Sequence, residues 1–161
     1  MRDGPRTLGD ELKEQFRRQW TTMREILANV PDAEWTSGDG ARVPARLLYH
    51  ILGGTETYAR STSYEEFLAT RRFPGDWDVV PLQQLPDRTT AAAQVRDMEA
   101  QVNSWLDQLG DSGLMEADPG FPWAGTRKLG RAVYLLRHTQ NHLGELNAEL
   151  SKRGVQVGRW G

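Results

Sequence analysis

The residues of this chain that are best suited to chemistry are its three histidines, and two of them lie four positions apart. His138 and His142 stand in the stretch RHTQNHLGELNAEL, residues 137–150. In a helix, residues four apart share one face and lie about 6 Å apart along the axis. Two imidazoles placed in this way can bind one metal ion, or they can simply occupy a helix surface.

Helical periodicity dominates the chain and predicts four long helices that would have to position these histidines. The first helix is expected from near Leu8 to before Pro31, and the second from Val43 or Pro44 to about Arg71. The third is expected from Thr90 to Gly110. The fourth is expected to have Thr126 as its N-cap and to stop at residues 152–154. Long loops rich in proline and glycine separate the second helix from the third and the third from the fourth. With no strand pattern and no repeat, the sequence predicts an all-α four-helix bundle in a single domain, residues 1–161.

The composition excludes several classes of site and partner. A net charge of −2 and a pI of about 5.9 argue against nucleic acid as a partner. The absence of cysteine excludes disulfides, thiolate metal sites and a cysteine nucleophile, so any thiol chemistry needs a thiol from outside. No apolar run approaches a membrane span, and no signal-peptide core is seen, so a cytoplasmic location is expected.

On helical wheels, the three histidines lie at the border of the apolar face and not at its centre. His50 borders the face of the second helix, and His138 and His142 border that of the fourth, with Glu145 on the same side. Bundle cores can hold metal sites built from facing helices, and three neutral imidazoles suit zinc, nickel, copper or ferrous iron. Three protein ligands leave coordination positions open, as in catalytic sites, whereas ordinary core or surface histidines remain the alternative.

Two further features near the histidines bear on the type of site. Thr139 stands where a zincin protease would have its glutamate, which disfavours a metalloprotease. Gly53 and Gly54 interrupt the predicted second helix at a cost of about 1 kcal/mol each relative to alanine. Gly54 lies one turn beyond His50, and Gly144 raises the same question in the fourth helix. Each glycine either makes room for a ligand or a neighbouring group, or allows close helix packing or a kink.

A histidine in the second helix followed by His-x-x-x-His-x-Gly-Glu in the fourth resembles the DinB-like superfamily, also called YfiT-like. The resemblance spans nearly the whole chain, and its most specific part is RHTQNHLGELNAELSKRG, residues 137–154. It implies an up-down-down-up bundle with one divalent transition metal, such as zinc, nickel or iron, on His50, His138 and His142 near one end of the bundle. It also implies a homodimer.

Characterised members of this superfamily are metal-dependent transferases or isomerases that use low-molecular-weight thiols such as mycothiol or bacillithiol. Others are described as metal-dependent hydrolases. The leading hypothesis is therefore a metal-dependent S-transferase that joins an external thiol to a small-molecule electrophile in detoxification. The alternatives are a hydrolase that uses metal-bound hydroxide, a non-catalytic metal or small-molecule binding protein, and a bundle without activity.

Several residues near the expected site have open roles. Glu145 is expected to orient His142 or to act as a base, or to be an ordinary surface carboxylate. Trp77 and Trp123 lie in the two long loops, where they would form the apolar wall of a substrate pocket, plug the bundle or make a dimer contact. Four arginines are candidates for binding an anionic thiol or substrate, although solvated surface positions are favoured for each: Arg46, Arg60, Arg131 and Arg137.

Overall fold

Helices make up nearly all of the regular structure in the computed structural model, which describes residues 6–156. Their bounds are α1 Leu8–Asn29, α2 Asp32–Trp35, η1 Gly40–Arg42, α3 Pro44–Tyr58, α4 Tyr64–Thr70, η2 Leu82–Gln84, α5 Arg88–Leu114 and α6 Lys128–Lys152. Within residues 6–156 the only β-type pairing is one isolated bridge between Ala117 and Arg127. The all-α prediction is thus confirmed, while the predicted domain, residues 1–161, extends beyond the described residues at both ends.

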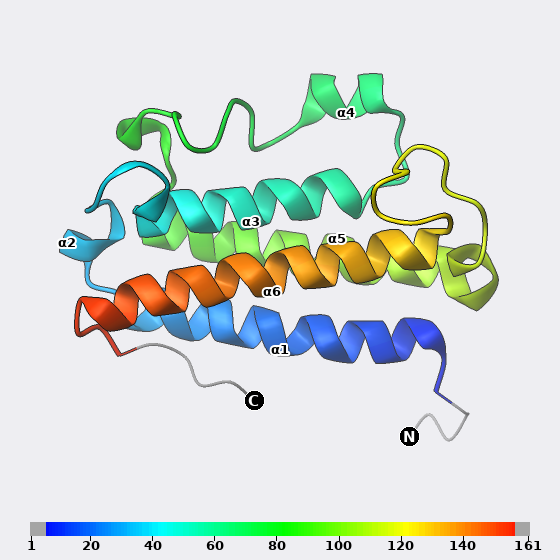
Figure 1. The fold of residues 1–161 in the computed structure, drawn as a ribbon, viewed down its shortest axis with the longest axis horizontal. Helices are drawn as coiled ribbons and strands as arrows, with labels where there is room; N and C mark the ends of the chain where they lie inside the picture. The colour runs from blue at the N-terminus through cyan, green and yellow to red at the C-terminus, as the bar shows by residue number, and fades with distance from the viewer. Residues whose placement is uncertain (1–5, 157–161) are drawn as a thin grey trace.

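The four long helices, α1, α3, α5 and α6, lie side by side around a shared apolar core (Figure 1). Helices α1 and α6 run in one direction, and α3 and α5 run in the opposite direction, which is an up-down-down-up order. The most extensive packing joins α3 to α6 and α1 to α5. The three histidines predicted as metal ligands therefore lie on two helices that are direct neighbours.

The first helix begins and ends where local chemistry requires. Thr7 forms a capping box with Asp10, because each side chain accepts a hydrogen bond from the other residue's backbone. The apolar positions at spacings of three and four are buried and face the core. They include Phe16, Trp20 and Met23. Pro31 follows the last turn and prevents its continuation.

The second long helix is shorter than the sequence pattern predicted. Helix α3 ends at Tyr58, and residues 64–70 form the separate helix α4, so the prediction of a helix to about Arg71 is wrong. Ser63 caps α4 by accepting a hydrogen bond from the backbone of Glu66. A serine followed three positions later by glutamate is an N-terminal helix signal, and it overrides the periodicity at this point.

The third and fourth helices also differ from their predicted bounds. Helix α5 spans Arg88–Leu114, and Gly110, the predicted end, has non-helical angles (φ 58°, ψ −176°) that separate the main helix from a short helical turn ending at Leu114. At the start of α6 the N-cap is Arg127, and its side chain makes no capping hydrogen bond, so the prediction of Thr126 as N-cap is wrong.

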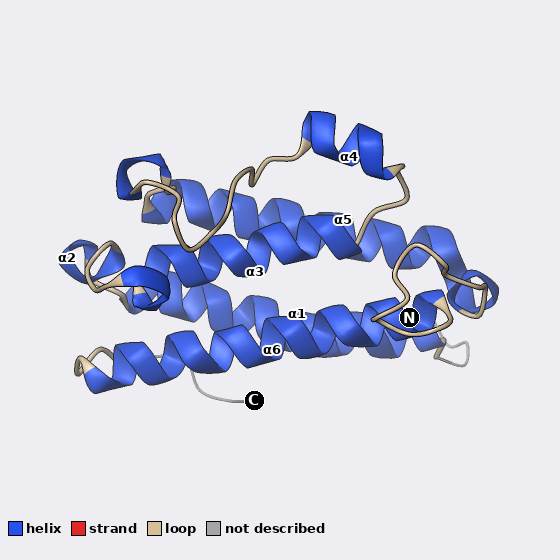
Figure 2. Cartoon of the chain, turned by 45° about the horizontal axis from the view of Figure 1, so that its top comes forward, coloured by secondary structure: helices blue, strands red, loops and turns tan. Residues whose placement is uncertain are grey.

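The segment between α4 and η2 runs back along α3 (Figure 2). Its middle part, residues 74–79, is here called the strap. Two buried side chains, Phe73 and Val80, anchor the strap at its ends, whereas Trp77 is the only strap residue that is not largely exposed. The strap lies over the part of α3 that carries His50, because the Trp77 ring stacks on the His50 ring.

Candidate metal centre

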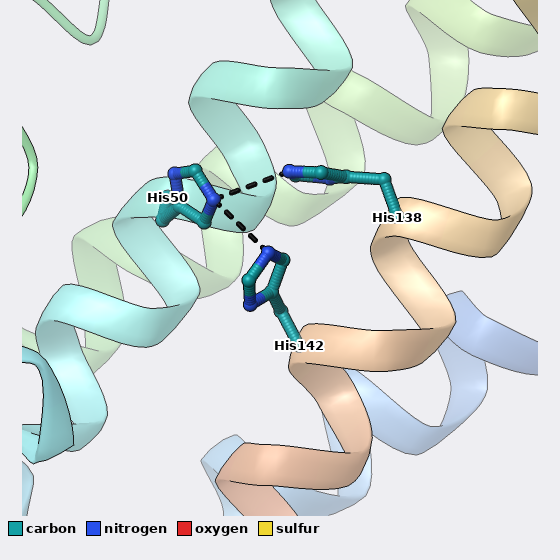
Figure 3. Close-up of side chains that lie close together, drawn as sticks. All are labelled: His50, His138 and His142. Atoms are coloured by element: carbon teal, nitrogen blue, oxygen red, sulfur yellow. Dashed lines mark hydrogen bonds between the residues drawn. The ribbon is translucent and has the colours of Figure 1, made fainter. Parts of the chain in front are cut away.

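The three histidines predicted as metal ligands come together between α3 and α6 (Figure 3). The Nε2 atom of His50 lies 3.1 Å from Nε2 of His138 and 3.1 Å from Nε2 of His142. The three potential ligand atoms all lie within 4.8 Å of one another, and each ring is partly buried. Two nitrogens that share one ion at about 2.1 Å can be separated by at most about 4.2 Å, and both 3.1 Å distances meet this condition.

The cluster lies near the middle of α6 and not at an end of the helix group. His138 and His142 stand close to the centre of Lys128–Lys152, and His50 lies within Pro44–Tyr58. The position near one end of the bundle that the resemblance implied is therefore wrong. Because the middle of a packed helix moves less than its ends, this location gives the imidazoles a rigid support.

The absence of a side chain at Gly54 leaves the space that the ring of His138 occupies. A Cβ atom at this position would lie 2.7 Å from Cε1 and 3.1 Å from Nδ1 of His138. Of the readings that the sequence left open, the structure thus selects room for a neighbouring group. Gly53 faces the Cβ of Phe73, and Gly144 faces open space, so neither makes room for a histidine.

The hydrogen-bonding capacity of the three rings fits a cation at their centre. The carboxylate of Glu145 accepts a hydrogen bond from Nδ1 of His142 at 2.8 Å, which leaves a lone pair on Nε2 of the neutral ring. The Nε2 atom of His50 has at most one proton, so it cannot donate to both of its neighbours. At least one nitrogen lone pair therefore faces the centre without a protein donor, as a metal ligand does.

Burial keeps two of these rings neutral. Loss of hydration, with a smaller effect of the neighbouring imidazoles, lowers the pKa of His50 from 6.5 to about 4. The pKa of His138 falls in the same way, from 6.5 to about 4, mainly through burial and then through His142. Neutral imidazole is the form that binds metal ions, so both rings are ready for binding at neutral pH.

Comparison with known proteins shows the family to which this chain belongs. A family model described as DinB superfamily matches residues 15–146. This chain belongs to the DinB superfamily. The matched range contains α3, most of α6 and all three histidines. Searches of curated proteins and of solved structures gave no match. Family membership and the three-histidine group together fit a metal-binding site in this DinB-superfamily chain.

Within the described residues of this DinB-superfamily chain, no helix is both long enough and apolar enough to span a membrane.

Aromatic side chains surround the three histidines of the candidate metal centre. Trp77 of the strap stacks on His50, with ring centroids 4.2 Å apart, so one of the two predicted wall tryptophans does border the site. Trp123 is 60% exposed and is linked to the site through Tyr58, whose hydroxyl accepts a hydrogen bond from its indole at 3.2 Å. Tyr58 and Tyr134 lie beside His138, with centroid distances of 6.2 and 6.4 Å.

Tyr58 and Tyr134 were not among the site residues predicted from the sequence. A signal for both was present, because Tyr134 lies four positions before His138 and Tyr58 lies eight positions after His50. These spacings place each tyrosine on the histidine-bearing face of its helix. Trp77 gave no such signal, since its position over His50 depends on the path of the strap.

In the metal-free protein, the two depressed histidine pKa values predict a loss of stability at acid pH. The unfolded chain takes up protons on these rings near pH 6.5, whereas the folded chain does so only near pH 4. Unfolded molecules thus bind more protons between these values, and the free energy of unfolding falls as pH is lowered from 6.5 to about 4. Urea unfolding in the presence of a chelator measures this fall. A His50→Gln/His138→Gln variant should show a smaller fall, and equal slopes would contradict the prediction.

The contact between Glu145 and His142 predicts a role for this carboxylate in metal affinity. Because Glu145 fixes the proton on Nδ1 of His142, replacement by alanine should weaken zinc binding about tenfold through loss of ring orientation. Competition with a chromophoric chelator measures the change. Glu145→Gln retains an acceptor oxygen and should lose less affinity. Unchanged zinc affinity in Glu145→Ala would show that the carboxylate, whose side chain is 53% exposed, is an ordinary surface group without effect on metal binding.

Proposed function

We propose that this DinB-superfamily protein is a metal-dependent enzyme that joins a low-molecular-weight thiol to a small-molecule electrophile. The observation that carries the proposal is the convergence of His50, His138 and His142 on one point, where one divalent ion would have three ligands and open positions. The thiol part rests on the resemblance to thiol-dependent members of the superfamily. The proposed setting is the cytoplasm, and the proposed assembly is a homodimer.

The residues present suit this chemistry. A divalent ion bound by the three imidazoles would favour ionisation of a coordinated thiol or water. Because the chain contains no cysteine, the sulfur nucleophile has to come from a second small molecule. Glu145 holds the proton of His142 on Nδ1 and thereby directs Nε2 to the site. Trp77 covers one face of His50 and excludes water from that side.

The test uses protein loaded with zinc, nickel or ferrous iron, together with mycothiol or bacillithiol and 1-chloro-2,4-dinitrobenzene as a model electrophile. In the expected reaction a sulfur–carbon bond forms and chloride leaves. Mass spectrometry should detect the thioether above the uncatalysed background, and a His138→Ala/His142→Ala variant should form none above it.

The other candidate functions give different results. Hydrolysis of an activated ester without added thiol, again dependent on the histidines, would favour the hydrolase. Tight binding of an electrophile that is recovered unchanged, with no product under any of these conditions, would refute the proposal of an enzyme and favour a non-catalytic binding protein. Both results would leave the metal site itself in place.

A further inference from the structure

The four arginines considered as anion-binding residues have very different surroundings. Arg131 is buried and pairs with Asp118, with 2.9 Å between Nε and Oδ2. Arg60 lies over the ring of Phe67 at 5.0 Å and also over those of Tyr64 and Phe121. Arg137 is exposed and lies 5.7 Å from the Tyr134 ring. The prediction of solvated surface positions is therefore wrong for Arg131, whose role in this structure is internal.

Arg46 is the exception among the four, because it is buried without a carboxylate partner. Only 8% of this residue is exposed, and its Nε atom has no hydrogen-bond partner. Its one hydrogen bond to the described part of the chain runs from Nη1 to the carbonyl oxygen of Trp77, at 3.2 Å. The prediction of a solvated Arg46 is thus wrong as well. The buried Nε–H therefore lacks both water and a protein acceptor, which is costly as it stands and leaves a donor available to an anion.

The position of Arg46 links it to the metal centre. It lies four residues before His50 on α3, so both side chains emerge from one face of the helix, about one turn apart. The residue that Arg46 contacts, Trp77, stacks directly on His50. The unpaired guanidinium and the metal ligands therefore lie beneath the same residue of the strap.

Few contacts hold the strap over this region. Two side chains of α3 donate hydrogen bonds to its backbone, Tyr49 to the carbonyl of Pro74 at 2.8 Å and Arg46 to that of Trp77. Most of its side chains are exposed, and the buried anchors Phe73 and Val80 lie outside it. A segment with so little buried area can open locally without disturbing the helices.

We propose that Arg46 is the anion-binding residue of the metal centre and that it binds the carboxylate of a small-molecule ligand when the strap lifts. The ligand would exchange the weak Trp77 carbonyl contact for a charge-assisted, two-point contact between guanidinium and carboxylate. Its other end would lie at the three histidines, about one helical turn away. This inference rests on the proposed function, and it specifies that the thiol or the electrophile carries a carboxylate.

Calorimetric titration of the zinc-loaded protein with 3-mercaptopropionate and with its neutral amide, 3-mercaptopropionamide, tests the inference. Wild-type protein should bind the acid at least about tenfold more tightly than the amide, since the charged contact is available only to the acid. Arg46→Gln should bind both alike, and Arg46→Lys should restore part of the preference. Arg71→Gln is the matched control, because Arg71 is exposed near the start of the strap and its loss removes the same charge.

The possible outcomes separate this inference from the proposed function. If the wild-type protein binds the two thiols equally, or if Arg71→Gln abolishes the preference as fully as Arg46→Gln does, the anion site is refuted while thiol binding stands. If neither thiol binds, the thiol function fails, and the same comparison with 3-phenylpropionate and 3-phenylpropionamide then decides the anion site. Equal or absent binding of that pair would refute it.

Movement of the strap has its own readout. Hydrogen exchange in the strap and Val80, residues 74–80, should become faster when 3-mercaptopropionate binds, because the turn bond from the Val80 amide to the Asp76 carbonyl loosens as the strap lifts. The amide should leave this exchange unchanged. Equal or slower exchange with the bound acid would contradict the lifting step.

Discussion

Replacing Gly54 with alanine is expected to weaken metal binding at least about 100-fold while leaving the fold intact. The new Cβ would lie 2.7 Å from Cε1 of His138, well inside van der Waals contact. The imidazole is the outer part of a flexible side chain, so it can turn away at little cost in stability, but its Nε2 then leaves the site. Alanine also favours the helix over glycine by about 1 kcal/mol, which should keep or raise the melting temperature.

Gly144→Ala is the matched control for this change. It makes the same substitution in a helix that carries two of the histidines, and a Cβ at Gly144 meets only open space. Zinc affinity, measured by competition with a chelator, and the free energy of unfolding should be determined for both variants. The prediction fails if Gly54→Ala binds zinc as the wild type does, or if both variants lose the same affinity.

Replacing Asp118 with alanine is expected to cost about 3 kcal/mol of stability, because it leaves the buried charge of Arg131 without its partner. Both residues are less than a tenth exposed, and 2.9 Å separates Nε from Oδ2. The guanidinium also lies between the rings of Trp105 and Phe121, at 5.1 and 4.5 Å, so it cannot easily reach water. Urea unfolding of the single variant measures the loss.

The double variant Asp118→Ala/Arg131→Met serves as the control for this pair. Methionine fills the space between the two rings without a charge, so the double variant should recover more than half of the lost free energy. A loss of less than about 0.5 kcal/mol in the single variant, the size typical of an exposed ion pair, would show that the pair contributes little.

The sequence carried most of the information on which residues form the candidate site. The spacing of His138 and His142 fixes them on one face of a helix whatever the surroundings. Their position at the border of the apolar arc, and that of His50, predicted partial burial, and the structure agrees. The sequence shows that Gly54 is unfavourable in the middle of a helix. It does not show which group occupies the space beside Gly54, because that group lies on another helix. Only the packing of α3 against α6 identifies that group as His138.

The features that the sequence did not reveal depend on contacts between distant segments. The separation of α4 from α3 has a local signal at Ser63, which the longer periodic pattern concealed. In contrast, the stacking of Trp77 on His50 depends on the path of an irregular strap, and no periodicity determines such a path. The same holds for the burial of Arg46, which looks like any polar residue in a helical pattern until the strap covers it.

We infer that His50, His138 and His142 together hold one divalent metal ion. Metal content measured by mass spectrometry on protein purified without an affinity tag tests this most directly, with a His138→Ala/His142→Ala variant beside it. About one equivalent of zinc, nickel or iron per chain is expected in the wild type and none in the variant. A wild-type protein that contains no metal, and takes up none on titration at neutral pH, would contradict it.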